Sequence, residues 1–116
     1  MSYIDGYVAA VPKANREAFL RQAQEMAPLF KECGALKVVE NWGDDVPKGK
    51  VTDFYMAVQS TDDENVVFSW IVWPDKATRD AGWAKAMADP RMQPGPNPVF
   101  DGKRMIFGGF ETLLDA

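Results

Sequence analysis

The segment Val66–Trp73 constrains the fold of this chain more than any other part of its sequence. All of its residues except Ser69 are β-branched or aromatic, and Pro74 follows directly. Such a run predicts a β-strand, and alternate residues of a strand point to opposite faces of its sheet. One side of this strand would carry Phe68, Trp70 and Val72, and the other Val67, Ile71 and Trp73. The sheet that contains it should therefore be apolar on both faces.

The other segments predict three more strands and two helices. Strands are expected over Tyr3–Val11, Leu36–Trp42 and Arg104–Thr112, and helices over Arg16–Cys33 and Lys76–Ala88. This order is the ferredoxin-like βαββαβ arrangement, an α+β fold with a four-stranded antiparallel sheet and two helices on one face. A chain of 116 residues with 47% hydrophobic and 26% charged residues has the size and composition of one globular domain, expected over residues 1–116.

Both helices have boundary signals and apolar stripes. Asn15 and Asp75 stand at the expected N-caps, and Gly34 stands where a left-handed residue would end the first helix. Pro28 should kink the last turns of that helix. The stripes expected to pack are Phe19, Ala23, Met26, Phe30 and Cys33 on the first helix and Ala77, Ala81, Ala84 and Ala88 on the second.

The segment Val51–Val58 fits two local structures. An apolar spacing of three and four residues fits a short helix capped by Thr52, whereas the alternation of Phe54, Met56 and Val58 fits a strand. The short helix is the preferred interpretation.

The doubly apolar sheet predicts self-association. Helices cover only one face of a ferredoxin-like sheet, so a second apolar face needs another cover. A two-fold interface requires only one self-complementary patch. We therefore expect a homodimer that packs through the sheet face away from the helices, forming a dimeric α+β barrel.

Charge and residue usage exclude several classes of function. The net charge is −4 and the basic residues are scattered, which argues against nucleic-acid binding. The chain has no histidine, so Ser–His and Cys–His nucleophile pairs and most zinc and haem sites are excluded, and no cofactor is expected. Cys33 falls on an apolar stripe and is interpreted as a packed thiol. Asp44 and Asp45 are interpreted as a solvated turn, so no metal is expected.

The sequence also predicts a cytoplasmic protein. The residues after Met1 lack the basic and apolar regions of a signal peptide, and the longest apolar run is too short to span a bilayer. No membrane partner is expected.

A few residues are candidates for a functional site. Glu40 shares its strand face with Val38 and Trp42, so it is expected to point inward, where it could act as a base. Arg104, at the start of the last strand, could pair with it or bind an anionic substrate, and Asp101 is a further carboxylate. An ion pair at the strand ends is the alternative explanation. The candidate ligand-binding residues are Tyr7, Trp42, Trp70 and Trp83, for which core and interface packing is the alternative.

Several stretches together resemble a known family. They are Tyr3–Val8, Pro28–Leu36, Val67–Ile71, Asp75–Ala81, Asp89–Met92 and Phe100–Phe110. These residues resemble the YbaA-like bacterial proteins over nearly the whole chain. The resemblance implies a dimeric α+β barrel, in which two ferredoxin-like sheets face each other, and no defined activity. The chain differs from the family pattern at Asn41, where cysteine would be expected, and in the stretch Pro94–Pro98.

Two functions remain open. An enzyme without a bound cofactor would be analogous in fold to cofactor-independent monooxygenases and lactone isomerases, and would use Glu40 or an aspartate as a base in an apolar cavity. A non-catalytic accessory protein would instead shelter an apolar small molecule or dock a partner. Convergence of Glu40, Asp101 and Arg104 on one cavity beside Trp70 would favour the enzyme.

Overall fold

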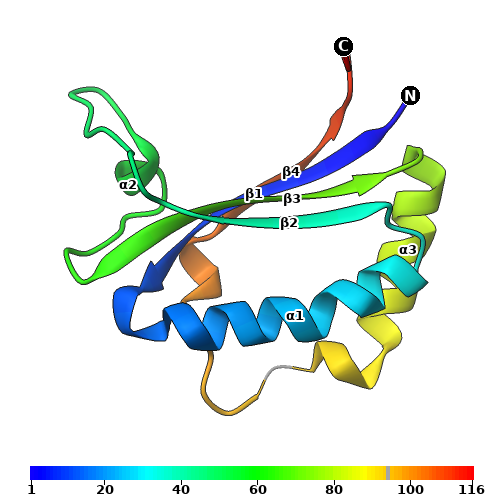
Figure 1. Cartoon of the computed structure of the whole chain (residues 1–116), viewed down its shortest axis with the longest axis horizontal. Coiled ribbons are helices and arrows are strands. Elements are labelled where there is room, and N and C mark those ends of the chain that lie inside the picture. Colours follow the sequence, from blue (N-terminus) through cyan, green and yellow to red (C-terminus); the bar gives the residue numbers. More distant parts are fainter. Residues whose placement is uncertain (94) are drawn as a thin grey trace.

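The fold was determined from a computed structural model, which describes residues 1–93 and 95–116. Seven main elements follow one another along the chain (Figure 1): β1 (Tyr3–Pro12), α1 (Arg16–Glu32), β2 (Lys37–Trp42), α2 (Phe54–Ala57), β3 (Glu64–Trp73), α3 (Lys76–Ala88) and β4 (Ile106–Glu111). Short 3-10 turns occupy Lys13–Asn15, Pro90–Met92 and Gly102–Arg104. Within the described part of the chain, no helix has both the length and the apolar character needed to cross a membrane.

The four strands form one antiparallel sheet in the order β2-β3-β1-β4. Helices α1 and α3 lie against one face of this sheet, and α2 lies over the other (Figure 1). This is the ferredoxin-like α+β fold, so the predicted fold class is confirmed. We call the surface covered by α1 and α3 the helix face and the opposite surface the open face.

The strand register determines which side chains meet on the helix face. Tyr7 of β1 lies opposite Ser69 of β3 and opposite Phe107 of β4, and Ser69 also lies opposite Glu40 of β2. One row of four side chains therefore crosses the whole sheet. The next row places Asp5 opposite Ile71.

Trp73 is the centre of the packing between the sheet and the helices. Its side chain is fully buried, together with Leu29 of α1 and Ala86 of α3. On α3 the buried positions are Gly82 and Ala86. The predicted stripe of Ala77, Ala81, Ala84 and Ala88 is wrong, because all four residues are exposed. Alanine adds little apolar area, so the partly buried Trp83 and the close approach of Gly82 to Trp73 set the orientation of α3 instead.

At the helix ends, some of the predicted caps are present and others are not. Asp75 caps α3, accepting a hydrogen bond from the Thr78 backbone N–H at 2.7 Å, and Gly34 has the expected left-handed φ of 113°. Asn15 does not cap α1, because its side-chain amide donates to the Val99 carbonyl at 2.7 Å. The preferred helix within residues 51–58 is present as α2, but its cap is Asp53 rather than Thr52.

The last strand is shorter than predicted. Arg104 belongs to the preceding 3-10 turn, and β4 begins two residues later. The proline-rich stretch that departs from the family pattern includes Pro94, which lies outside the described residues.

Candidate functional site

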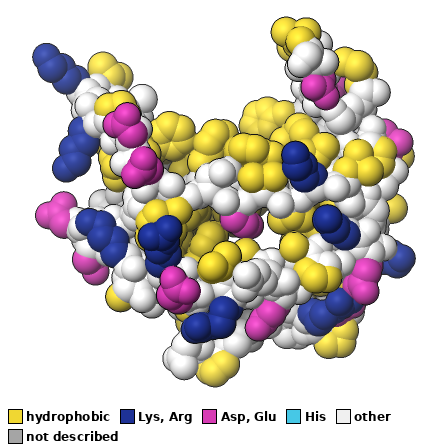
Figure 2. Space-filling view, in the orientation of Figure 1, with side chains coloured by type: hydrophobic (Ala, Val, Ile, Leu, Met, Phe, Trp, Pro, Cys, Tyr) yellow, Lys and Arg dark blue, Asp and Glu magenta, His cyan; other side chains and the backbone are white. Residues whose placement is uncertain are grey.

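A cavity of about 840 Å³ lies between the helix face of the sheet and helices α1 and α3. The surface is hollowed at this place in the space-filling view (Figure 2). Most of the predicted apolar stripe of α1 faces this cavity. The helices contribute Phe19, Ala23, Met26 and Phe30 from α1 and Trp83 and Met87 from α3. Helix spacing of three and four residues is what brings these side chains to one wall.

Glu40 is the polar centre of the sheet wall. Its Oε2 accepts a hydrogen bond from the Tyr7 hydroxyl at 2.5 Å and another from the Ser69 hydroxyl at 2.5 Å. These groups meet because Glu40, Ser69 and Tyr7 occupy one row of the sheet. No hydrogen bond to Oε1 is formed by the residues that the structure describes.

Tyr7 is held as a hydrogen-bond donor. Burial is the first cause that raises the pKa of its hydroxyl above the ordinary range, and the adjacent Glu40 carboxylate is the second. Since a higher pKa keeps the phenol protonated at neutral pH, Tyr7 donates to Glu40 and does not serve as a base.

Asp5 forms a second polar cluster in the wall of the cavity. Its Oδ2 accepts hydrogen bonds from the indole N–H groups of Trp73 at 2.9 Å and Trp83 at 2.8 Å. Arg79 of α3 approaches from the other side, with Nη2 2.8 Å from Oδ1 and its guanidinium carbon 5.2 Å from the Tyr3 ring centroid. The hydrogen bonds to Asp5 raise the pKa of Arg79. This cluster fixes α3 to β1 and therefore fixes one wall of the cavity.

Three of the candidate residues line this cavity, namely Tyr7, Glu40 and Trp83. Asp101 and Arg104 do not. The Arg104 guanidinium contacts Glu64 at 2.6 Å and Asp101 at 3.0 Å, and Asp101 caps the 3-10 turn that contains Arg104. The structure therefore does not bring Glu40, Asp101 and Arg104 together.

The remaining two tryptophans lie elsewhere. Trp70 is on the open face, with its ring edge-to-face against Phe68 at a centroid distance of 5.5 Å. Trp42 lies beneath the guanidinium of Arg16 at 5.5 Å and beside Phe19 at 6.5 Å. Trp70 and Trp83 are thus separated by the sheet.

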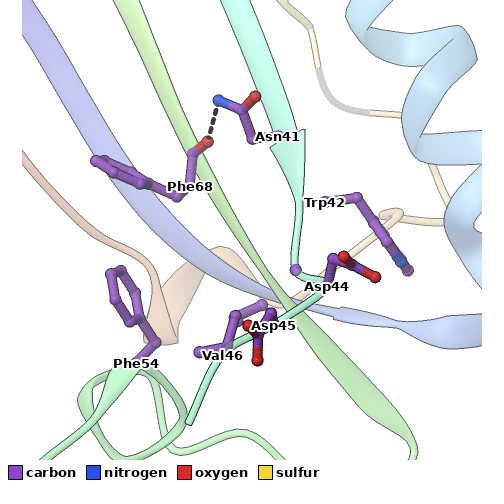
Figure 3. A pocket seen from close by; sticks show the side chains of 9 residues that line it. Asn41, Trp42, Asp44, Asp45, Val46, Phe54 and Phe68 are labelled. Carbon is purple, nitrogen blue, oxygen red and sulfur yellow. Dashed lines mark hydrogen bonds between the residues drawn. The ribbon is translucent and has the colours of Figure 1, made fainter.

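A second pocket, of about 280 Å³, lies between the end of β2 and α2. Figure 3 shows the rings of Phe54 and Phe68 on one side of it and Trp42 directed away from them. The Asn41 amide donates to the Phe68 carbonyl at 2.9 Å. Asp44 and Asp45 also line this pocket, but the described residues contain no group of three or more Cys, Asp or Glu side chains placed to hold a metal ion.

Sequence reasoning missed Asp5 and Arg79. A usable signal was present, because Asp5 alternates with Tyr3 and Tyr7 in a strand that is otherwise largely apolar. A charged residue at such a position has to find a partner when it is buried. Its partners are 68 to 78 residues away in the chain, so the sequence did not identify them.

Comparisons with known proteins agree with this description. Residues 2–102 match the family described as protein of unknown function (DUF1428). The uncharacterized protein YbaA of Escherichia coli K12 is 56% identical over 116 residues, which cover 99% of both chains, and YbaA of Shigella flexneri matches equally.

The fold is also found in a solved structure. A dimeric ferredoxin-like protein from an uncultured marine organism superposes with a TM-score of 0.63 and 16% identity, covering 99% of this chain and 98% of the other. The resemblance seen in the sequence is confirmed, and the chain belongs to the DUF1428 family, together with YbaA.

Proposed function

We propose that this protein binds a small, mostly apolar molecule in the cavity between the sheet and the helices. The observation that carries the proposal is a hydrogen-bonded carboxylate, Glu40, in the wall of a cavity whose lining includes six aromatic rings and four methionines. Ligand sites are commonly concave and apolar, with a few placed polar groups, and have volumes of roughly 300–1,000 Å³. The volume of about 840 Å³ lies in this range.

The composition of the walls favours an adaptable site. Four of the six methionines of the chain line the cavity: Met26, Met87, Met92 and Met105. Methionine has an unbranched, polarizable side chain that changes rotamer readily and contacts aromatic rings favourably. Such walls suit a ligand with an aromatic body and tolerate variation in its shape.

A second candidate function is proton transfer within the same cavity. It is favoured by the hydrogen bonds from Tyr7 and Ser69, which orient the Glu40 carboxylate and leave Oε1 free to accept a proton. Glu40 would be the base and Tyr7 would stabilise it as a donor. A solvent-derived deuterium exchanging into a bound ligand, and failing to do so in Glu40→Gln, would support this function over binding alone.

Binding is tested with a matched pair of variants. Ala23→Trp places a large side chain in the cavity from α1, whereas Ala81→Trp places the same side chain on the exposed surface of α3. Apolar aromatic molecules that raise the Tm of the wild type should raise that of Ala81→Trp equally and leave that of Ala23→Trp unchanged. Equal stabilisation of all three proteins, or stabilisation of none, would contradict the proposal.

We also propose that the protein assembles as a homodimer through the open face. This surface is built from Ile4, Val8, Val39, Phe68, Trp70, Val72, Ile106 and Phe110. Phe68 is 49% exposed and Phe110 59% exposed. Figure 2 shows hydrophobic side chains gathered above the sheet, between α2 and the C-terminal end. A second copy of the chain could cover them, because a two-fold interface needs only one self-complementary patch. The structural neighbour is also described as dimeric.

A further inference from the structure

The charged groups around the cavity leave one carboxylate uncompensated. Two guanidinium groups line it, and both are already engaged, Arg79 with Asp5 and Asp80 and Arg91 with Glu32 and Asp89. By contrast, no Lys or Arg of the described chain lies within salt-bridge distance of Glu40. The cavity therefore carries negative charge at its sheet wall.

The hydrogen-bonding groups beside Glu40 also leave an acceptor free and no donor. Tyr7 and Ser69 both direct their hydroxyl hydrogens at Oε2, so neither hydrogen is free for a ligand. Oε1 is left as an acceptor without a partner among the described residues. A group entering this end of the cavity meets an acceptor and has to bring the donor itself.

We infer that the cavity selects molecules with a hydrogen-bond-donating head group on an apolar body, and that Glu40 is the group that receives it. A hydroxyl or a protonated amine supplies such a donor. It donates a hydrogen bond to Oε1, while the apolar part of the ligand contacts the aromatic and methionine side chains. This inference rests on the proposed function, because it names the class of ligand for the same cavity.

The same arrangement discriminates against carboxylates. A carboxylate ligand would have no free donor at this wall, and its charge would lie close to that of Glu40 in a partly desolvated space, where like charges repel more strongly than in water. An uncharged apolar molecule would leave Oε1 without a partner. We therefore expect ligands with a donor head group to bind most tightly, uncharged apolar molecules less tightly, and carboxylates most weakly.

The test uses four ligands with one ring system and different head groups. They are 2-naphthol, 2-(aminomethyl)naphthalene, 2-methylnaphthalene and 2-naphthoate, titrated into the wild type at pH 7 by calorimetry. At least one of the two donor ligands should bind about tenfold more tightly than the methyl compound, as expected for a hydrogen bond to a charged group. Naphthoate should bind more weakly than the methyl compound. Tighter binding of the amine would indicate that pairing of opposite charges contributes most, and tighter binding of the naphthol would indicate that a hydrogen bond from an uncharged donor to the carboxylate suffices.

Glu40→Gln isolates the role of the carboxylate. Glutamine keeps an oxygen that accepts from Tyr7 and Ser69, so the fold should be retained, while the charge is removed. In this variant the dissociation constants of the amine, methyl and carboxylate ligands should differ by about threefold or less. Glu25→Gln is the matched control, because it makes the same charge change at an exposed position of α1 and should leave the wild-type order intact.

The outcomes separate this inference from the proposed function. If naphthoate binds as tightly as the donor ligands, or if Glu40→Gln retains the wild-type order, the inference is overturned while binding of apolar molecules stands. If none of the four compounds binds, including the methyl compound, the proposed function fails as well.

Discussion

Asp5 and Glu40 are two carboxylates on the same face of the sheet, and their partners give them different roles. Asp5 is surrounded by Arg79 and two indole N–H groups, which use its acceptor capacity. Glu40 is bound by two hydroxyl groups on one oxygen only. The first arrangement holds α3 in place, and the second leaves an acceptor for a ligand.

Replacing Asp5 should be costly for stability. Asp5→Asn should lower the free energy of unfolding by about 3 kcal/mol, because it leaves the mostly buried Arg79 guanidinium without its main counter-charge. Asp80→Asn removes the other carboxylate on Arg79, which is 50% exposed, and should lower the free energy of unfolding much less, because solvent screens this pair. Urea unfolding of both variants measures the difference, and equal costs would show that Asp5 does not hold α3.

The Glu64–Arg104 pair should make stability depend on pH. The hydrogen bond from Arg104 is the largest cause that lowers the pKa of Glu64 from its ordinary 4.5 to about 2. Because the folded-state pKa is the lower one, the pair stabilises the fold above about pH 4.5, and this contribution is lost as the pH falls towards 2.

The variant Glu64→Gln reports on this pair. At pH 7 it should be less stable than the wild type by roughly 2 kcal/mol, less than the pKa difference alone implies, because solvent screens the partly exposed Arg104. The difference should shrink in urea unfolding at pH 3. Asp101→Asn, which alters the more exposed partner of Arg104, should cost less at pH 7. A Glu64→Gln difference that does not change between pH 7 and pH 3 would disprove the linkage.

Single residues differ in how far the sequence could place them. Alternation along β2 placed Glu40 on the same face as Val38, and this was enough to predict that it points inward. The role of Arg104 could not be predicted in the same way, since its partner Glu64 is 40 residues away and is reached only once the strands are in register. Long-range ion pairs depend on the register, which local patterns do not specify.

At the scale of elements, α3 is seated by a close contact between Gly82 and the Trp73 ring. A Cβ atom added at Gly82 would lie 2.5 Å from the Trp73 ring and 2.7 Å from the carbonyl oxygen of Cys33. Only glycine allows the helix to approach so closely. This contact also positions the next residue, Trp83, whose indole N–H donates a hydrogen bond to Asp5.

Gly82→Ala should therefore be destabilising even though alanine is the better helix former. The gain in helix propensity is about 1 kcal/mol, but the helix has to move away from Trp73 and the Cys33 backbone, so we expect a net loss of about 1–2 kcal/mol. Gly102→Ala is the control, because nothing lies within 4 Å of a Cβ there and the change should stay within about 0.5 kcal/mol. Thermal unfolding of both compares them directly. A stabilised Gly82→Ala protein would show that the contact is not tight.

Elements were predicted in proportion to the strength of their patterns. The element types of β3 and α1 were predicted correctly from their apolar patterns. Large apolar side chains are stabilised by burial, so their spacing along the chain indicates which element buries them. The alanines of α3 gave the wrong face, since the helix orientation depends on glycine and tryptophan contacts that periodicity does not reveal. The predicted cap at Asn15 is wrong because its side-chain amide donates to the distant Val99 carbonyl, 84 residues away in the chain. The predicted cap at Thr52 is wrong because the neighbouring Asp53 accepts the hydrogen bond from the Met56 backbone N–H instead.

Across the whole molecule, the two faces of the sheet present different surfaces. The helix face contributes the carboxylates of Asp5 and Glu40 to the cavity, whereas the open face carries the exposed rings of Phe68 and Phe110. The proposed self-association through the open face would leave the cavity available to a ligand.

The assembly is tested by a charge on the open face. Phe68→Glu should convert the proposed dimer into a monomer in sedimentation velocity, because the charge would be desolvated in the interface. Leu20→Glu introduces the same charge at a similarly exposed position of α1, on the far side of the cavity, and should remain dimeric. A monomeric wild type at micromolar concentration would contradict the self-association proposal.

The indole N–H signals of the four tryptophans report whether a ligand binds between the sheet and the helices. A heteronuclear NMR titration of the wild type with 2-naphthol, with the signals assigned by Trp→Phe variants, follows each of them separately. We predict that the Trp83 signal shifts with ligand concentration, because this indole lines the cavity and donates to Asp5, while the Trp70 signal on the open face does not. A shift of the Trp70 signal with an unchanged Trp83 signal would place the ligand on the open face and contradict binding in the cavity.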